Sequence, residues 1–565
     1  MKNHLKIIII SLLIMMINNI MTSAEDTEKA KLDFSGSLSL SADLYSMDSD
    51  GGIMARRPNS LYRFIANTNL QYEKFSMPFS LMLSSNQTNF TTPQAPDQDI
   101  WQYLQNPMNR LSIAPKYDWA QLRLGHYIPD YSDLSTGNTP VFGGGFELTP
   151  GDFHIAGYFG SIQRAIEPDS NKNIAGAYAR SIYTFRFAYG SRGGFQAGIN
   201  FVNMEDDTSS IEDKPRGRYP EAGKLMSIDF RIPIIPNLTF LGEAGACFFT
   251  RNQYSDEIEN EELDFLPDFL KPKYSSRLDY AGKAGFRLAF DNWGADISGL
   301  YVGDGYVPLG YRFFQSDRLE YTIAPYLNLF DNKLMIRGSI GQRFNNLQDT
   351  KSETSSQLIA SLNATYMITE SFSVNADFSN YGVRNNVDND TLKVEMVSRA
   401  FSLMPNYTIR SKFASHNIMA MYSQDDFTDF NTFTGESRSN ITQTFMGGYT
   451  IRFNDLPISS TLSFNHIQND LKQGELSMTT MNIGMDYRFL DNKLKPGVRF
   501  TYTLSSIGEN TDDQQLKVRL SAKYNITRSL SARMSAYINN YDYGSQRQGI
   551  SYSESFMQMM ISYRF

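Results

Sequence analysis

The alternation of apolar and polar residues is the feature that most limits how this chain can fold. Between Leu516 and Ile526, apolar side chains occupy every even position and polar side chains occupy every odd one. This period of two predicts a β-strand with one apolar and one polar face. The pattern recurs in segments along the chain, including 183–189, 282–290, 481–489 and 498–504. Segments of about 10 to 14 residues exceed the usual strand length in soluble proteins and match tilted membrane-crossing strands.

Short and long connections alternate between these segments. Short Asp-Asn turns occur at 330–333 and 490–493, whereas long polar connections occur at 251–279 and 303–317. Outer-membrane barrels have short turns on the periplasmic side and long loops on the outer side. The rhythm therefore predicts an all-β fold, a single antiparallel up-and-down transmembrane barrel of about 26 strands (24–26) spanning 32–565. A soluble sandwich or propeller would need shorter strands.

The first residues indicate export from the cytoplasm. Lys2 and Lys6 precede an apolar run at 7–16, and small residues follow it. A run of about 10 apolar residues is too short to span a bilayer, so we interpret 1–24 as a secretory signal peptide. Only a short periplasmic segment, 25–31, would then precede the barrel, and we expect neither a plug domain nor a periplasmic domain.

The C-terminal strand carries a specific pattern. Phe565 is the last residue, and Tyr563, Ile561 and Met559 continue the same apolar face at alternate positions. This arrangement resembles the terminal strand that bacterial outer-membrane barrels present to their insertion machinery. The resemblance implies that these four residues form a barrel insertion signal and that the barrel assembly machinery is a partner.

Further segments resemble a poorly characterised set of large porin-like bacterial outer-membrane β-barrels. They are Gly303-Asp304-Gly305-Tyr306-Val307-Pro308-Leu309-Gly310, the hairpin at 329–334, and the stretches 144–148 and 161–165. The resemblance covers most of the mature chain. It implies a location in the bacterial outer membrane, in contact with lipid and lipopolysaccharide, and it implies no particular substrate.

Residues that would support other functions are sparse. His126, His154, His416 and His466 lie outside metal-ligand spacing of one another and of Cys247. No phosphate-binding glycine motif is present, and a formal charge of −8 argues against nucleic-acid binding. We therefore expect no metal, no cofactor, no catalytic residues and no nucleic-acid partner.

The polar faces of the strands are rich in cations. If the apolar faces contact lipid, the polar faces line the interior, and a wet channel lined by one charge concentrates ions of the opposite sign. This predicts a lumen that favours anions. Alternatively, the cations pair with acids on neighbouring strands and brace the wall. The predicted lumen-lining cations are Arg231, Arg287, Arg337, Arg343, Arg452, Arg488, Arg499, Lys517, Arg519, Lys523 and Arg533.

The connection after Arg251 combines acidic and apolar residues. Its acids are Asp256, Glu257, Glu259, Glu261, Glu262, Asp264 and Asp268. A short amphipathic helix formed here could fold into the mouth of the barrel as a gate. Alternatively, the segment is an outer loop held among lipopolysaccharide molecules by divalent ions.

Two functional hypotheses follow. The first is a porin-like channel, narrowed by its own loops, for diffusion of small polar and preferentially anionic solutes. The second is a structural or docking barrel of a secretion or surface-assembly complex, whose lumen holds a protein partner. Barrels of 16 to 18 strands already enclose an aqueous channel, so about 26 strands leave room for either function.

Overall fold

The computed structural model describes most of the chain after the predicted leader. The described residues are 32–50, 53–85, 100–106, 108–137, 139–172, 174–191, 193–215, 217–258, 271–311, 314–471, 474–508, 512–544 and 551–565. The predicted signal peptide and the segment 25–31 lie outside these ranges.

The described chain is almost entirely β-structure. The first half contains β1 (Asp33–Ser49), β2 (Ser60–Tyr72), β3 (Phe75–Ser84), β4 (Arg110–Ile113), β5 (Lys116–Tyr117), β6 (Ala120–Tyr127), β7 (Val141–Leu148), β8 (Phe153–Gln163), β9 (Ala179–Gly190), β10 (Gln196–Asp207), β11 (Ala222–Ile235), β12 (Leu238–Thr250), β13 (Ser276–Ala289) and β14 (Trp293–Val302). The second half contains β15 (Arg318–Leu329), β16 (Leu334–Phe344), β17 (Ser355–Met367), β18 (Phe372–Asn385), β19 (Glu395–Arg410), β20 (Ala414–Asp429), β21 (Asn440–Phe453), β22 (Ile458–Leu471), β23 (Gly474–Tyr487), β24 (Leu494–Ile507), β25 (Asp512–Asn525), β26 (Leu530–Asp542) and β27 (Tyr552–Arg564).

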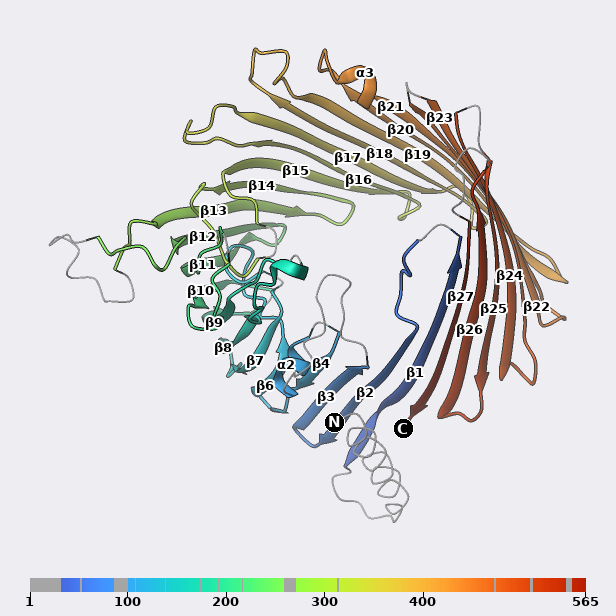
Figure 1. Cartoon of the computed structure of the whole chain (residues 1–565), viewed down its shortest axis with the longest axis horizontal. Coiled ribbons are helices and arrows are strands. Elements are labelled where there is room, and N and C mark those ends of the chain that lie inside the picture. The colour runs from blue at the N-terminus through green and yellow to red at the C-terminus, as the bar shows by residue number, and fades with distance from the viewer. Residues whose placement is uncertain are drawn as a thin grey trace.

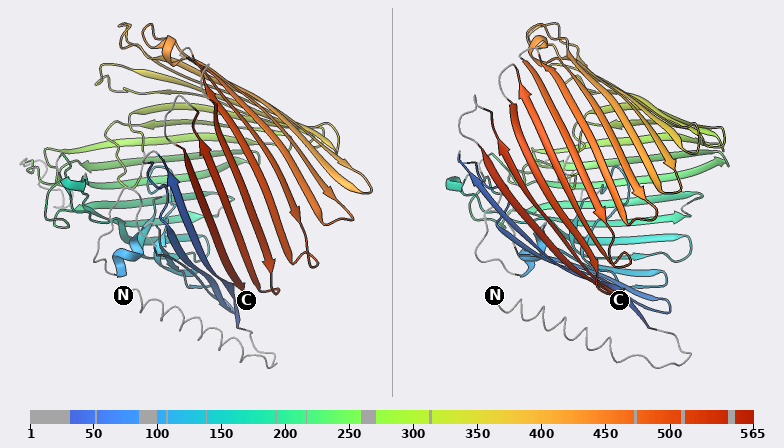
Figure 2. Two further views of the ribbon diagram at one scale, coloured as in Figure 1. Left: turned by 45° about the vertical axis from the view of Figure 1, so that its right-hand side comes forward. Right: turned by 90° about the vertical axis from the view of Figure 1, so that its right-hand side faces the viewer.

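These segments form one closed antiparallel barrel, seen end-on in Figure 1 and with its tilted strands from the side in Figure 2. Sequential strands pair with each other, and β1 pairs with β27 from Ser37 opposite Arg564 to Ser49 opposite Tyr552. β4 and β5 both pair with β3 and with β6, so they are two parts of one strand. The 27 segments therefore make 26 strands, and the predicted fold and strand number are confirmed.

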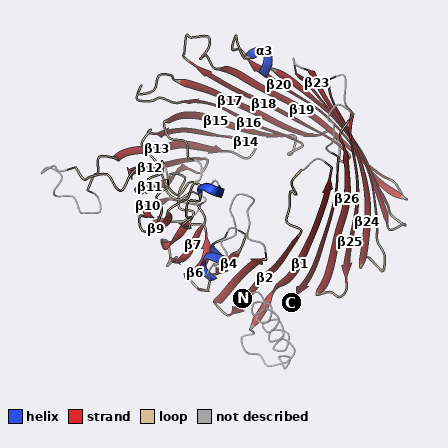
Figure 3. Cartoon of the chain, viewed as in Figure 1, coloured by secondary structure: helices blue, strands red, loops and turns tan. Residues whose placement is uncertain are grey.

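The two ends of the barrel have different connections. At the end that we call the short-turn end, connections range from two residues at 73–74 to six at 488–493. At the opposite, long-loop end, most connections are longer and contain the short helices α2 (Ile100–Gln105), η1 (Ser170–Lys172) and α3 (Gly435–Arg438), as Figure 3 shows.

The predicted Asp-Asn turns have a shared geometry. Phe330, Asp331 and Asn332 have φ values of 53°, 55° and 65°, and residues 490–492 repeat the pattern. Asp and Asn tolerate this left-handed region because their short side chains bond locally to the backbone. The turn residues thus reverse the chain at the predicted positions.

The outer face of the barrel is apolar. Ile199, Ile340 and Leu520 are 46%, 53% and 54% exposed on widely separated strands. Large apolar side chains are costly to expose to water, so a continuous apolar belt of this kind is a lipid-contacting surface. Within the described residues, no helix is long and apolar enough to cross a membrane.

Candidate transport lumen

On one side of the barrel, two of the described connections fold inward and cover the inner wall (Figure 1). We call residues 128–137, between β6 and β7, and 303–311, between β14 and β15, the infolded loops. Tyr306 lies at the centre of their packing and is fully buried. It belongs to an apolar cluster with Leu134 of the other infolded loop and with inward-facing residues of β7 and β9–β14, namely Val141, Ile182, Val202, Met204, Leu225, Cys247, Ala281 and Val302. A dry core therefore forms inside the barrel.

Polar contacts fasten the infolded loops to the wall and to each other. The Tyr306 hydroxyl donates to the Leu134 carbonyl at 2.7 Å, and the Leu134 amide donates to Glu243 of β12 at 3.0 Å. Asp133 forms an ion pair with Lys283 of β13. Because the buried groups find partners here, the loops can remain inside the lumen without unsatisfied backbone.

The inner wall beside these loops carries charges that are already paired. The Arg186 guanidinium donates to both carboxylate oxygens of Asp229, at 2.6 and 2.9 Å, and to Asn200 at 2.6 Å. It also donates to the Tyr131 carbonyl of an infolded loop at 3.2 Å. This arginine braces the wall and holds a loop.

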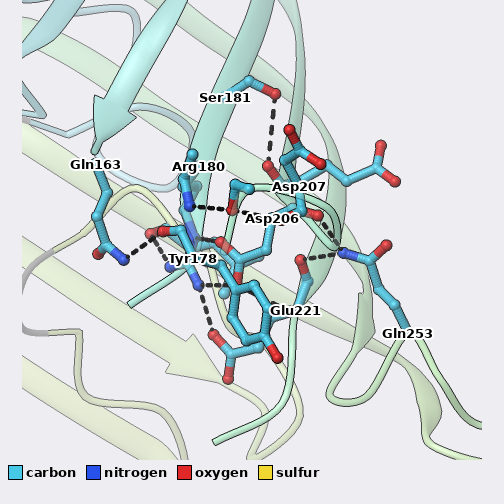
Figure 4. Close-up of polar contacts among 12 residues, drawn as sticks. Gln163, Tyr178, Arg180, Ser181, Asp206, Asp207, Glu221 and Gln253 are labelled. Atoms are coloured by element: carbon cyan, nitrogen blue, oxygen red, sulfur yellow. Dashed lines mark hydrogen bonds and ion pairs between the residues drawn. The ribbon is translucent and has the colours of Figure 1, made fainter. Parts of the chain in front are cut away.

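A second paired cluster lies at the long-loop end of the same wall (Figure 4). Arg180 donates to the two oxygens of Asp206 at 2.7 and 2.9 Å and to Glu221 at 2.8 Å. It also reaches the Leu309 carbonyl at 3.3 Å. The cluster borders a cavity of about 580 Å³ that Arg218 and Arg251 also line. Within the cluster, Arg180 is the one cation and faces two carboxylates, so the cluster itself carries no net positive charge.

The strand register places the predicted lumen cations on the inner face, with Arg488 just beyond the end of β23. Two of them are paired: Arg287 with Asp296 at 2.9 Å and Arg343 with Glu320 at 2.8 Å. The others form no ion pair with a carboxylate in the described part of the chain: Arg231, Arg337, Arg452, Arg488, Arg499, Lys517, Arg519, Lys523 and Arg533.

Most of the unpaired cations gather on three neighbouring strands. In register, Lys523 of β25 lies opposite Lys495 of β24 and Arg533 of β26, and Arg519 lies opposite Arg499. From Lys523 to Lys517 the row extends about 20 Å along β25, close to the height of an apolar barrel belt of about 25 Å. We call this set, Lys495, Arg499, Lys517, Arg519, Lys523 and Arg533, the basic wall.

Further cations continue the basic wall toward the long-loop end. The connection after β1 places Arg56 over the Tyr552 ring at 5.2 Å and Arg57 over the Phe556 ring at 4.8 Å. Lys517 itself lies 4.2 Å from the centre of the Tyr537 ring. Cation–π contacts orient a charge without neutralising it, so these three side chains keep their positive charge.

Two inward-facing carboxylates near the basic wall, Asp43 and Glu554, have other partners. Asp43 pairs with Arg63 at 2.8 Å, and Glu554 accepts hydrogen bonds from Tyr45 at 3.0 Å and Asn539 at 3.1 Å. The two sides of the inner wall therefore differ: Arg180, Arg186 and Lys283, beside the infolded loops, are paired with carboxylates, whereas the cations of the basic wall are not.

Two groups of predicted residues lie elsewhere. Asp256 and Glu257 are exposed where the β12–β13 connection begins, and the other five predicted gating acids lie outside the described residues. At the C-terminus, Met559 and Ile561 lie on the outer face, exposed by 42% and 53%. Phe565 extends the closing seam, because its backbone exchanges hydrogen bonds with Gly36 at 2.9 and 3.2 Å.

Some lumen residues carried no recognisable sequence signal. Lys495 precedes Pro496, which interrupts the alternation at the start of β24. Arg56 and Arg57 lie in a connection rather than in a strand. The register of β24 with β25 is what assigns Lys495 to the basic wall.

Asp317, the last residue of the connection between β14 and β15, ties that connection to the next long one. Its carboxylate accepts hydrogen bonds from the backbone amides of Asn346 and Leu347, both at 2.8 Å, and pairs with Lys351. Burial alone would raise the pKa of this carboxyl, but the lysine and the two amides outweigh burial and hold the pKa below its ordinary value. The charged form therefore stabilises the connection at neutral pH.

We expect Asp317→Asn to make the connection at 345–354 sensitive to protease, because the ion pair and one amide bond are lost, at a local cost of about 1–3 kcal/mol. In the wild type, the stability that the charged Asp317 carboxylate gives to the connection is complete above the unfolded-chain pKa of about 4. It declines as the pH falls through the lower pKa of the folded state. Asp349→Asn, an exposed change in the same connection, is the matched control. If the connection is equally resistant to protease in both variants at neutral pH, Asp317 does not stabilise it.

Comparisons with known proteins give matches among solved structures only, at low identity and low TM-score. Neither a protein-family model nor a curated protein sequence matches the chain. The crystal structure of Acinetobacter baumannii OccAB4 is 12% identical, with a TM-score of 0.29, over 66% of this chain and 97% of that one. Pseudomonas aeruginosa OpdK, solved with vanillate, is 12% identical, with a TM-score of 0.30, over 61% and 93%. The P pilus usher (PapC) translocation pore is 10% identical, with a TM-score of 0.38, over 94% and 99%. By its own strand pairing and apolar exterior, the chain is a 26-stranded barrel of the outer-membrane type.

Proposed function

We propose that this protein is a porin-like channel of the bacterial outer membrane, through which small polar solutes diffuse with a preference for anions. The observation that carries the proposal is the basic wall, six inward-facing cations that have no carboxylate partner in the described chain. Unpaired cations in a wet lumen raise the local concentration of anions.

The lining next to the basic wall supports a water-filled path. Hydroxyl pairs face the interior across neighbouring strands, with Thr450 and Thr461 at 3.3 Å and Thr480 and Thr503 at 3.0 Å. Such side chains are hydrated at little cost, in contrast to the dry core under the infolded loops. Solutes would therefore pass along the polar and basic side of the lumen.

Single-channel recording of the purified barrel in planar bilayers tests the channel itself. We expect stable open-state conductance, because the infolded loops cover one side of the wall and leave the basic wall accessible. A barrel that remains closed and co-purifies with a partner chain would instead support the docking hypothesis.

A further inference from the structure

One part of the basic wall forms a distinct cavity at the short-turn end. Lys495, Lys523 and Arg533 come from three adjacent strands and border a space of about 300 Å³. Ser521 and Ser535 add hydroxyl groups to its lining. A volume of this size falls within the range of small-molecule sites.

The placement of these three cations is unfavourable without a ligand. Like charges directly opposite each other on neighbouring strands are destabilising, and adjacent strands lie only about 5 Å apart. No described carboxylate lines the cavity or pairs with any of the three. Asp486 lies on the neighbouring strand β23, opposite Gly497 of β24. It forms no ion pair with a described residue.

We propose that this cavity binds a tetrahedral oxyanion group, a phosphate or sulfate group carried by a small solute. This inference rests on the proposed channel function and names the class of its preferred solute. A chloride or monocarboxylate ion supplies one negative charge to three cations, whereas a phosphate group supplies up to two.

The donor types also suit this chemistry. The Arg533 guanidinium presents a planar fork that bonds two oxygens of one oxyanion, and the two lysine ammonium groups can approach the other oxygens as point charges. The serine hydroxyls add neutral donors. Gln558 also lines the cavity, but its side-chain amide already donates to Asp43 at 2.9 Å. The oxyanion would therefore be bound mainly by the three cations.

Equilibrium binding of inorganic phosphate to the purified barrel, followed by calorimetry at neutral pH, tests the proposal. We expect saturable binding of phosphate. Sulfate should displace the phosphate, whereas chloride at equal ionic strength should not. In the double variant Lys523→Gln with Arg533→Gln, affinity should fall at least about tenfold, as when charge-assisted hydrogen bonds are removed. Arg528→Gln, which removes one exposed positive charge in the turn between β25 and β26, should leave affinity unchanged.

Thermal unfolding gives a second measurement on the same proteins. Phosphate should raise the unfolding temperature of the wild type and of Arg528→Gln, but not of the double variant, because only a native-state ligand stabilises by mass action. The unliganded double variant should be at least as stable as the wild type, since it loses repulsion. Absence of saturable binding to the wild type, or equal loss in Arg528→Gln, would overturn the proposal.

This result is separable from the channel function. Binding is measured without current, so it can be present in a barrel that proves to be closed. Conversely, anion preference can persist in the double variant through Arg499, Lys517 and Arg519, in which case the channel function holds and the oxyanion site is judged by binding alone.

Discussion

Replacing Tyr306 with alanine should release the infolded loops and raise the single-channel conductance. The tyrosine ring is fully buried between the loops and the inner wall, and its hydroxyl bonds to Leu134 in the other loop. Removing a buried aromatic side chain costs about 3–5 kcal/mol. Because the backbone pairing of the barrel does not involve this side chain, we expect the barrel to form and the loops to become accessible to protease.

Two variants separate the possible causes of this effect. Tyr306→Phe keeps the ring and loses one hydrogen bond, so it should cost only about 1–2 kcal/mol and raise conductance less. Tyr274→Ala removes a tyrosine side chain that is 75% exposed. It should change neither the conductance nor the resistance of the loops to protease. If Tyr306→Ala has wild-type conductance while its loops are cleaved, the infolded loops do not narrow the pore.

Inverting the charge of the basic wall should reverse the ion preference of the channel. In the triple variant Arg499→Glu, Arg519→Glu and Lys523→Glu, three inward-facing cations become anions, and the focused field changes sign. We expect the zero-current potential across a potassium chloride gradient to change sign relative to the wild type. The effect should shrink at high salt, where the screening length falls to about 3 Å.

A charge-matched control places the same changes outside the lumen. Lys333, Lys412 and Arg528 are exposed in turns at the short-turn end, and their replacement by glutamate alters the formal charge of the protein equally. These substitutions should leave the sign of the zero-current potential unchanged. If the control variant and the basic-wall variant shift it equally, net charge rather than lumen position sets the preference.

The architecture was predictable because its signal is local. Each strand reveals its two faces within about ten residues, as in the alternation of Leu516 and Leu520 with Lys517 and Arg519. The tight turns are equally local, because Asp331 and Asn332 favour the required left-handed backbone. A barrel is then the way in which many such strands leave no open edge.

The internal arrangement was less predictable because it depends on contacts between distant residues. Tyr306 meets Leu134 across 172 residues of sequence. Alternation identified Lys523 and Arg533 as inward-facing, but only their register with Lys495 shows three cations around one cavity. The same applies to pairing: the composition of the strands does not distinguish paired Arg287 from an unpaired cation such as Arg499.

The decisive measurement is the zero-current potential of the wild-type channel across a potassium chloride gradient. If the unpaired cations of the basic wall make the lumen favour anions, the potential has the sign of chloride selectivity. This anion preference should be largest at low salt, where the wall is least screened. A potential with the sign of potassium selectivity would contradict it.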